Sequence, residues 1–479
     1  MTYGQLSPGQ CAAALLLLAA GVALVLIAQR RDWRPSLMVA IYVALLLRLV
    51  MLALAWRTQP YDLANDFKTA GWDVLHHQDP ILNNRSNGWG SLPVYAFVLA
   101  GAYWASVHLH ISWLIVARLP EIVCDLGVVV LVGVLADAAG GRGALRRFQY
   151  ACSPLPILVS SVHGQAEPFC FLFALGAFAL ILRAGPQISA RRAVAAGLLF
   201  GVAIAAQTWP VVFGPALFLA LPAWRRRAQF TAGAAAILAL LFVTLPVTVG
   251  TPVAKLPFIA TQFFETRPSF GNFGWSGVWL TVHPTKLPVW QDPLWLNAGS
   301  LGAKIAIVGA LLAVWWWRRG HPLDIATATT TTLLALTPSF GNQYLVWQAP
   351  SATARPARLS IALQIVLGAF AAIFYLPMQM LTWQNWVTVN NVMMFVSLFV
   401  VAFMIAALPW SRRRWQPPAQ TASPGEERLQ YSGGLPPAHN GDSPTAVSGF
   451  QASNGAEAPS IEQDNAATPS PYLDPADPG

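Results

Sequence analysis

The sequence predicts an all-α fold: a polytopic membrane protein of about 12 helices with two long extracytoplasmic loops. Of the 479 residues, 55% are hydrophobic and 10% are charged, whereas a soluble protein carries about a quarter charged residues. Apolar runs recur along the chain, and several reach the ~18–20 residues that cross a bilayer. Arginines cluster in short segments between these runs. Because backbone groups in lipid must pair within their own segment, the runs are expected to be helices.

Seven arginine clusters predict which helix ends face the cytoplasm. The first helix is expected to end inside, at Arg30, and the second to return outward. The segments at about 57–91 and 251–297 then become the two outer loops. The net charge of +9 follows from the cytoplasmic loops, so no nucleic-acid partner is expected. The clusters are Arg30/Arg31/Arg34, Arg142/Arg146/Arg147, Arg191/Arg192, Arg225/Arg226/Arg227, Arg318/Arg319, Arg355/Arg358 and Arg412/Arg413/Arg414.

The apolar runs predict where the helices lie along the chain. The first has no basic segment before it, so we expect a retained helix and not a cleaved signal. Leu92–Ser106 is expected to lie partly in the outer leaflet, because an odd number of crossings must separate the first outer loop from Arg142. The expected helices are Cys11–Ala28, Leu37–Trp56, Leu92–Ser106, Leu119–Ala136, Phe148–Val162, Phe169–Arg183, Ala193–Gln207, Val211–Ala223, Phe230–Gly250, Ala303–Trp317, Leu323–Pro338, Tyr344–Ala354, Ser360–Leu376 and Val392–Pro409.

Composition changes sharply after residue 416. The segment 417–479 is rich in Pro, Ser, Gly, Ala and Asn and poor in apolar residues, so it cannot bury enough surface to fold. The sequence therefore predicts one membrane domain over 1–416 and a disordered cytoplasmic tail over 417–479. The four cysteines lie in apolar segments without the spacing of a metal site or a disulfide framework.

The first outer loop holds an unusual group of carboxylates, in "YDLANDFKTAGWDVLHHQD". Twelve of the 20 Asp and Glu residues lie in the first 416 residues, and four of those twelve lie in this stretch. "DFKTAGWDVL" can form an amphipathic helix on the membrane surface, with Asp66 at or near its N-cap. Asp62 or Asp66 would then lie at the outer surface, where a carboxylate can take the proton of an attacking sugar hydroxyl. Asp73 and Asp79 are predicted to be structural.

Two polar turns at the outer ends of helix pairs are further candidates. In "SSVHGQAEP", His163, Gln165 and Glu167 lie within five residues, and such side chains are costly at membrane depth and usually functional. We interpret Glu167 as a catalytic candidate and the other two as substrate-binding candidates. In "GNQYLVWQAP", Gln343 and Tyr344 can line a sugar or lipid pocket, although an aromatic belt explains the aromatic residues almost as well.

A third group of charged residues lies in one predicted helix. Arg118, Glu121 and Asp125 have the spacing i, i+3, i+7, which places them on one helix face. A structural ion-pair network that orients the helices is the preferred interpretation. Arg48, in the second helix, is expected either to reach the membrane surface or to pair with one of these carboxylates.

The second outer loop supplies two candidate phosphate partners, Lys255 and Arg267. Arginine suits bidentate contacts with phosphate. An exposed loop arginine without such a role explains Arg267 about equally well.

Four segments in a fixed order resemble the GT-C class of multi-spanning glycosyltransferases, most of all the GPI mannosyltransferase I catalytic subunits and their prokaryotic relatives. They are "DLANDFKTAGWDVLHHQDP", "LPEIVCDLG", "SPLPILVSSVHGQAEP" and "NQYLVWQAP", spread over residues 60–350; "GVAIAAQTWP" is also similar. The resemblance implies a catalytic carboxylate in the first outer loop, which is Asp62 or Asp66 here. The family often has Asp-x-Asp, where this chain has Asp-Leu-Ala-Asn-Asp. Spacing from Pro80 favours Asp62, and the start of the helix favours Asp66.

These features predict an inverting membrane glycosyltransferase. It would move a sugar, with mannose favoured, from a polyprenyl- or dolichyl-phosphate carrier to an extracytoplasmic glycan, lipid or protein acceptor. No cofactor is required, and a metal is not obligatory because phosphate is a good leaving group. The expected partners are the lipid bilayer, the lipid-linked sugar and the acceptor; a partner subunit is left open. In a prokaryote the location would be the plasma membrane, with the active site outside and the tail inside.

Two alternatives remain from the sequence. A membrane transporter or lipid-linked sugar flippase is expected to have polar or broken helices at the bilayer midplane, or an internal repeat. No repeat is visible, and the acids gather at the predicted outer surface. The other alternative is a non-catalytic subunit with a degenerate site, which the altered motifs keep open.

Overall fold

The chain is a helical, multi-pass membrane protein. The computed structural model describes residues 6–83, 89–262, 274–283, 292–339, 341–410 and 415, and the tail predicted over 417–479 lies outside them. Every regular element in these ranges is helical. Eight helical segments in them are long and apolar enough to cross a membrane: Pro8–Arg31, Leu37–Ala55, Trp113–Ala138, Glu167–Gln187, Trp224–Thr248, Pro293–Trp317, Ser360–Met380 and Gln384–Ala406.

The described part contains α-helices joined by short 3₁₀- and π-helices. In chain order they are α1 (Pro8–Arg31), α2 (Leu37–Ala55), η1 (Asp62–Asp66), α3 (Phe67–Leu75), α4 (Pro80–Asn83), α5 (Val94–His108), α6 (Trp113–Val116), α7 (Leu119–Ala138), α8 (Gly143–Ala151), α9 (Pro154–Leu158), η2 (Val159–His163), α10 (Glu167–Ala184), η3 (Gly185–Gln187), α11 (Ala190–Ala206), η4 (Trp209–Phe213), α12 (Gly214–Ala220), α13 (Trp224–Thr248), η5 (Val253–Lys255), α14 (Leu256–Gln262), α15 (Trp275–Val282), α16 (Pro293–Trp317), α17 (Pro322–Leu336), η6 (Asn342–Gln348), α18 (Ala349–Ala354), α19 (Ser360–Tyr375), η7 (Pro377–Met380) and α20 (Trp383–Ala406).

The first two helices begin where the sequence supplies a serine cap. At the start of α1, the Ser7 hydroxyl accepts a hydrogen bond from the Gln10 backbone N–H at 3.2 Å, and the Gln10 side chain accepts one from the Ser7 N–H at 3.0 Å. Ser36 caps α2 by accepting a bond from Val39 at 3.3 Å. Such caps satisfy amides that the first turn of a helix leaves unpaired. Both helices agree with their predicted ranges to within three residues.

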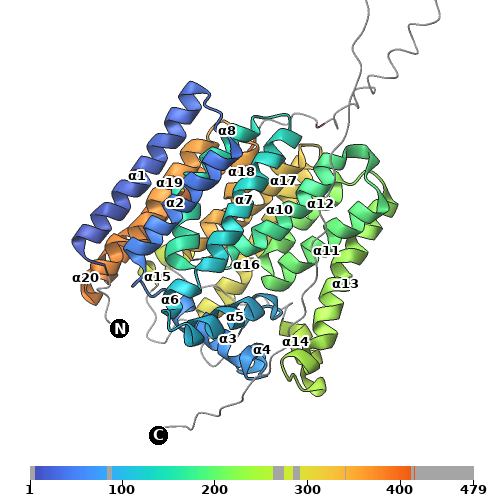
Figure 1. The fold of residues 1–479 in the computed structure, drawn as a ribbon, viewed down its shortest axis with the longest axis horizontal. Coiled ribbons are helices and arrows are strands. Elements are labelled where there is room, and N and C mark those ends of the chain that lie inside the picture. The colour runs from blue at the N-terminus through green and yellow to red at the C-terminus, as the bar shows by residue number, and fades with distance from the viewer. Residues whose placement is uncertain are drawn as a thin grey trace, which may run out of the picture. The chain divides into compact units, whose positions relative to one another are not determined.

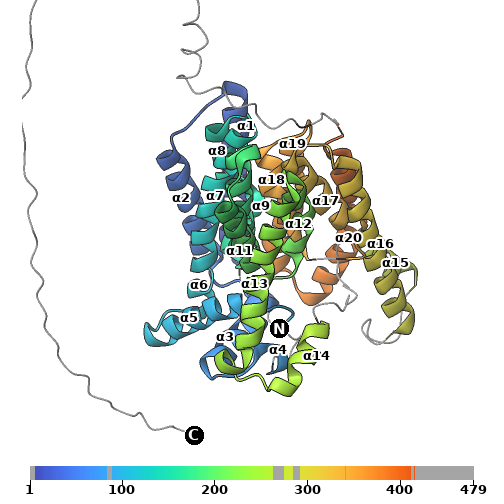
Figure 2. The same cartoon turned by 90° about the vertical axis from the view of Figure 1, so that its right-hand side faces the viewer.

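The long helices pack side by side as a bundle (Figure 1). α7 packs against α8 and α10, α10 against α11, and α11 against α13; α16 packs along α17. In both ribbon views α3, α4, α5 and α14 lie together at one end of the bundle, and α8 lies at the other (Figures 1 and 2). The two predicted outer loops therefore supply small helices to the same end.

The end of the bundle that carries α8 also joins two of the arginine clusters. Asp32 accepts bonds from Arg34 at 2.8 Å and from Arg142 at 2.5 Å. Arg146 donates to the Gln29 side chain at 3.1 Å. The Arg34 guanidinium beside Asp32, with Arg142, holds the pKa of that carboxyl below its ordinary value. The clusters predicted to share the cytoplasmic side therefore share one end of the bundle.

The predicted count of about 12 crossings is not confirmed, because several predicted helices are broken or short. The predicted Phe148–Val162 helix is divided at Ser153, whose backbone is extended (φ −70°, ψ 131°) because Pro154 follows it. α8 ends before this break, and α9 with η2 follows it. The predicted Tyr344–Ala354 helix consists of η6 and the six-residue α18, which are too short to span a bilayer.

Both predicted loops contain helices, and the second loop ends earlier than predicted. α5, after the first loop, runs across the end of the bundle and not along it (Figures 1 and 2). In the second loop, the Asp292 carboxylate accepts a bond from the Leu294 N–H at 2.9 Å, and Pro293 occupies the first position of α16. Both features start helices. α16 therefore begins at Pro293, where the apolar pattern predicted Ala303.

Candidate functional site

Asp62 lies where the first loop meets the turn of the "SSVHGQAEP" segment. It begins the π-helix η1, which continues directly into α3. The Asp62 Oδ2 accepts a hydrogen bond from the Gln165 side-chain amide and lies 3.7 Å from His163 Nε2. The Asp62 side chain is 34% exposed, so the carboxylate is held by protein and still accessible. Three residues singled out in two distant sequence segments therefore share one site.

Gly164 lets the two segments approach this closely. It lies just after η2 with a left-handed backbone (φ 74°), a conformation that costs other residues roughly 1–2 kcal/mol. A Cβ atom at this position would lie 2.8 Å from Arg118 Cγ and 3.3 Å from Leu63. Both the backbone conformation and the available space therefore require glycine between His163 and Gln165.

Two side chains near the start of α7 fix the stretch of loop that carries the carboxylate. The Arg118 guanidinium donates to the carbonyl oxygens of Trp56 and Thr58 at 3.2 and 2.8 Å, and to the Thr58 hydroxyl at 3.0 Å. The Trp113 indole N–H donates to the Leu63 carbonyl oxygen at 2.8 Å. The first loop is thus anchored to the bundle just before η1 and within it.

Tyr375 belongs to the site, although the sequence analysis missed it. Its hydroxyl lies 3.0 Å from His163 Nδ1. His163 lies outside the eight candidate spans, and burial lowers its pKa to about 4, so the imidazole is neutral at pH 7. When Tyr375 donates to Nδ1, the single ring proton is on Nε2, which faces Asp62. Tyr375 ends the apolar helix α19, and no motif surrounds it that could have indicated a role.

Glu167 is fully buried at the start of α10, two residues after Gln165. Its Oε1 accepts a bond from the Trp347 indole N–H at 3.4 Å. The Trp347 ring stacks on Trp209, with centroids 4.4 Å apart and planes 8° apart. The centroid of the Tyr344 ring lies 4.8 Å from that of Trp347. Burial, with the nearby acids, raises the pKa of Tyr344 above its ordinary value. The "QTWP", "HGQAEP" and "QYLVW" turns therefore meet around one buried acid.

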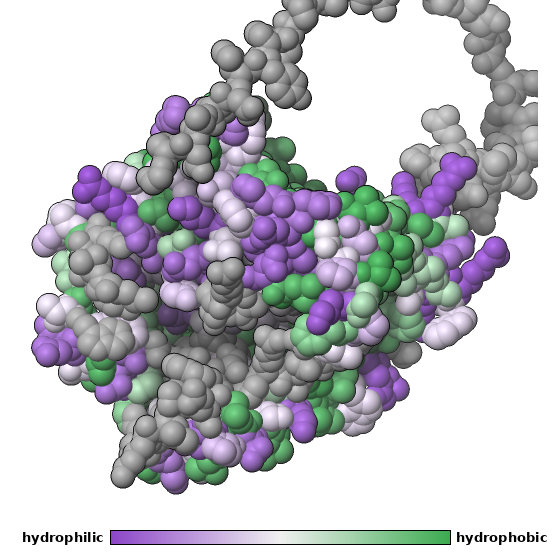
Figure 3. Space-filling view, turned by 90° about the horizontal axis from the view of Figure 1, so that it is seen from below, coloured by the Kyte–Doolittle hydropathy of each residue, from purple (hydrophilic) through white to green (hydrophobic). Residues whose placement is uncertain are grey.

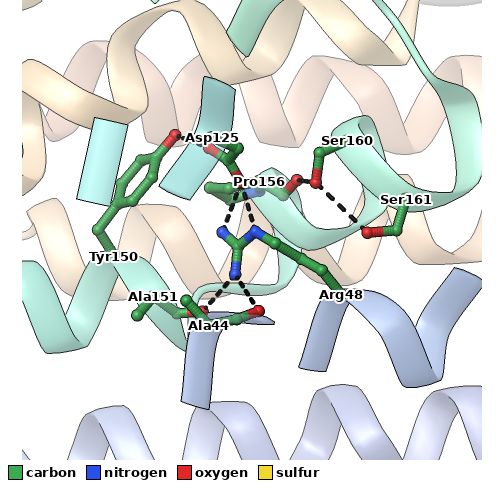
Figure 4. Close-up of polar contacts among 8 residues, drawn as sticks. All are labelled: Ala44, Arg48, Asp125, Tyr150, Ala151, Pro156, Ser160 and Ser161. Atoms are coloured by element: carbon green, nitrogen blue, oxygen red, sulfur yellow. Dashed lines mark hydrogen bonds and ion pairs between the residues drawn. The ribbon is translucent and has the colours of Figure 1, made fainter. Parts of the chain in front are cut away.

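A buried ion pair lies deeper in the bundle (Figure 4). Arg48 Nη2 lies 2.5 Å from Asp125 Oδ2, and both side chains are fully buried. The Tyr150 hydroxyl donates to Asp125 Oδ1 at 2.9 Å. Arg48 Nη1 donates to the carbonyl oxygens of Ala44 and Ala151 at 3.0 and 2.9 Å. Of the two roles that the sequence left open for Arg48, pairing with a carboxylate is confirmed.

The predicted network of Arg118, Glu121 and Asp125 takes a different form. The Arg118 guanidinium donates to backbone carbonyls of the first loop, and Glu121 accepts a bond from the Phe169 N–H at 3.3 Å. Asp125 pairs with Arg48. The three side chains share a helix face, but they lie at different heights along α7, so each meets a different neighbouring element.

The other three acids of the first loop are Asp66, Asp73 and Asp79. Asp79 is structural, since it accepts bonds from the Ile81 N–H at 2.7 Å and from the Thr251 hydroxyl at 2.5 Å. Asp73 is buried in α3. Asp66 lies at the N-cap position of α3, as predicted, but its side chain forms no cap bond, because η1 continues the helix through it (φ −65°, ψ −45°).

Of the three remaining candidates, two lie within the residues that the structure describes and one lies outside them. Gln343 is buried in η6, and Lys255 is exposed at the end of η5. Arg267 lies outside the described residues. Within the ranges that the structure describes, no group of three or more His, Cys, Asp or Glu side chains could hold a metal ion.

A comparison with models of known protein families finds no match for this chain, and a comparison with curated proteins finds no relative. A functional assignment must therefore come from the residues and their geometry.

Proposed function

We propose that the protein is an inverting membrane glycosyltransferase that takes a sugar from a polyprenyl-phosphate carrier, with Asp62 as the general base. The observation that carries this proposal is the cluster of Asp62, His163 and Gln165: an accessible carboxylate held by an amide and an imidazole. Such a carboxylate can accept a proton from an attacking hydroxyl. Further support comes from the segments that resemble GT-C glycosyltransferases, because two of them meet in this cluster and a third adjoins it at Glu167.

In the proposed reaction, an acceptor hydroxyl attacks the anomeric carbon of the donor sugar on the face opposite the phosphate. A bond forms between the hydroxyl oxygen and the anomeric carbon while the bond from that carbon to the phosphate oxygen breaks, which inverts the configuration. The hydroxyl proton passes to the Asp62 carboxylate, and the phosphate leaves with its prenyl chain. Asp62 then releases the proton to solvent through its exposed edge.

The neighbours of Asp62 act as positioning residues in this scheme. The Gln165 amide donates to one carboxylate oxygen, Oδ2, which orients the carboxylate. A neutral His163 adds no full positive charge that would weaken the base. Glu167, with the Trp347 indole on its Oε1, is proposed as a second acid that contacts the acceptor or assists the base.

The donor would approach from the bilayer. Lys255 or Arg267 of the second loop is proposed to bind its phosphate, because Arg and Lys stabilise phosphate oxygens. Mannose is the favoured sugar, and a glycan, lipid or protein is the acceptor. The end of the bundle that carries α3 and α4 is proposed to face outward, opposite the arginine clusters.

The proposal is tested by transfer with purified protein. The protein is incubated with prenyl phosphates that carry radiolabelled mannose, glucose or galactose, together with extracts of membrane lipids, glycans and proteins as acceptors. We expect label to move to an acceptor in a protein-dependent reaction, with inverted anomeric configuration in the product. If no donor is used while an active GT-C enzyme transfers sugar in the same mixture, the proposal fails.

A further inference from the structure

A groove opens between the first loop and the residues that follow α13. Its volume is about 920 Å³, near the upper end of the range of roughly 300–1,000 Å³ found for ligand pockets. One wall comes from η1, α3 and α4, and the other includes Gly250 and Pro252. Figure 3 shows the end of the bundle that carries these helices, with hydrophilic residues gathered on it.

Apart from the exposed imidazole of His77, the accessible polar groups of this groove are amides and hydroxyls. Asn65, Gln78 and Asn83 supply amides, and Tyr61 and Thr69 supply hydroxyls. No lysine or arginine occurs among the described residues that line it, so this lining offers a phosphate no guanidinium or ammonium group. Amides and hydroxyls both donate and accept hydrogen bonds, which matches the hydroxyl groups of a carbohydrate.

The two acids in the lining are buried in the wall of the groove and are not exposed on its surface. Asp73 and Asp79 are each 3% exposed. The two oxygens of Asp79 accept bonds from the Ile81 N–H and the Thr251 hydroxyl, at 2.7 and 2.5 Å. The contact with Thr251 ties the first loop to the second, so the two walls are held together before any ligand arrives.

Gly250 brings the second wall into place. Its backbone is left-handed (φ 69°), and a Cβ atom there would lie 2.5 Å from the His77 carbonyl oxygen. Only glycine fits both the conformation and this close approach. The close contact between the two loops at Gly250 therefore shapes the groove.

Trp72 provides a flat apolar surface in the groove. It is 38% exposed, and its ring stacks on His76, one turn later, with centroids 4.0 Å apart. The His76 Nδ1 lies 2.8 Å from the Trp72 carbonyl oxygen, which fixes the stack. A rigid, exposed aromatic ring gives a large contact area at low entropic cost, and the C–H face of a sugar ring packs well on such a surface.

We propose that this groove binds the acceptor as a neutral carbohydrate chain and selects against phosphorylated chains. Tyr61 and Asn65 line the groove and lie in or beside the same short helix as Asp62, so this part of the groove adjoins the residue that bears the proposed base. The binding of neutral carbohydrate follows from the lining alone. The role of the bound chain as acceptor rests on the proposed function.

Binding is tested on the full chain without any donor. The protein is held in lauryldimethylamine oxide, a detergent without a sugar head group, and titrated with mannotriose, maltotriose, cellotriose and singly phosphorylated mannotriose by saturation-transfer NMR. We expect at least one neutral trisaccharide to bind and the phosphorylated one to bind more weakly. Trp72→Ala is expected to raise the dissociation constant of the neutral ligand about tenfold or more, as removal of a central aromatic contact typically does.

Trp104→Ala is the matched control. Trp104 is 51% exposed, stacks on His108 with centroids 4.5 Å apart and has the same 2.8 Å contact between His108 Nδ1 and its own carbonyl oxygen, but it does not line the groove. Its replacement should leave the dissociation constant unchanged. Equal weakening by both substitutions, binding of no neutral trisaccharide, or tighter binding of the phosphorylated one would each overturn the proposal.

A competition arm identifies the source of the carbohydrate. Displacement of the bound trisaccharide by octyl mannoside assigns the groove to sugars carried on a lipid, and failure to displace it assigns the groove to free or protein-linked chains; both results support a neutral ligand. The binding titration contains no donor, so it is independent of the transfer assay. If a trisaccharide binds in a manner that depends on Trp72 but no sugar is transferred in the other assay, the result counts against the proposed enzyme alone. Transfer without such binding would count against the groove alone.

Discussion

Replacing Asp62 by asparagine is expected to slow sugar transfer about 10²- to 10⁴-fold, the usual contribution of a general base. The asparagine oxygen can still accept the bond from Gln165, so the shape of the site is kept. The amide cannot take the proton of the acceptor hydroxyl, so the chemistry is lost. The measurement is the initial rate of transfer from the labelled prenyl-phosphate sugar, with gel filtration to show that the variant is folded.

Asp66→Asn is the matched control for this prediction. Asp66 lies in the same five-residue helix and was an equal candidate from the sequence, but the Gln165 amide donates to Asp62. We expect transfer by Asp66→Asn to remain close to that of the unmodified protein. A large loss in Asp66→Asn with none in Asp62→Asn would contradict the assignment.

Replacing Arg48 by methionine is expected to lower the free energy of unfolding by about 3–5 kcal/mol, the usual cost of leaving one member of a buried ion pair alone. Arg48 is fully buried and pairs with Asp125, and it also joins α2 to the end of α8 through the Ala151 carbonyl oxygen. The measurement is unfolding by sodium dodecyl sulfate in mixed micelles, followed by circular dichroism.

Two further variants separate burial from charge. The double variant Arg48→Met/Asp125→Leu removes both charges and should recover much of the lost stability. Arg34→Met breaks a pair of similar length with Asp32, but those side chains are 60% and 38% exposed, so little change is expected. If Arg34→Met destabilised the protein as much as Arg48→Met, the argument from burial would fail.

The parts of the fold that follow from local signals were predictable. The serine at position 36 and the apolar run after it define α2, and the arginines in the last turn of α1 mark its end. The breaks were harder to predict, because a single apolar run such as 148–162 hides the effect of Pro154 on the preceding residue. The early start of α16 also depended on a short cap at Asp292, which the hydrophobic pattern alone does not contain.

The candidate site was predictable only residue by residue. The scarcity of carboxylates pointed to Asp62 or Asp66, and the polar turn pointed to His163 and Gln165. Their contact could not be predicted, because it depends on Gly164 and on the bonds from Arg118 to the first loop. Those are contacts between residues far apart in sequence, and no local pattern encodes them.

The orientation of the bundle tests the central claim most directly, because a lipid-linked sugar outside the cytoplasm must meet Asp62. Single cysteines are introduced at Lys68, exposed in α3, and at Arg225, exposed at the start of α13, and whole cells are treated with a membrane-impermeant maleimide. The unmodified protein, with its four native cysteines buried or half-buried, gives the background. The account predicts that Lys68→Cys is labelled in intact cells and Arg225→Cys only after permeabilisation. Labelling of Arg225→Cys in intact cells, with Lys68→Cys protected, would contradict it.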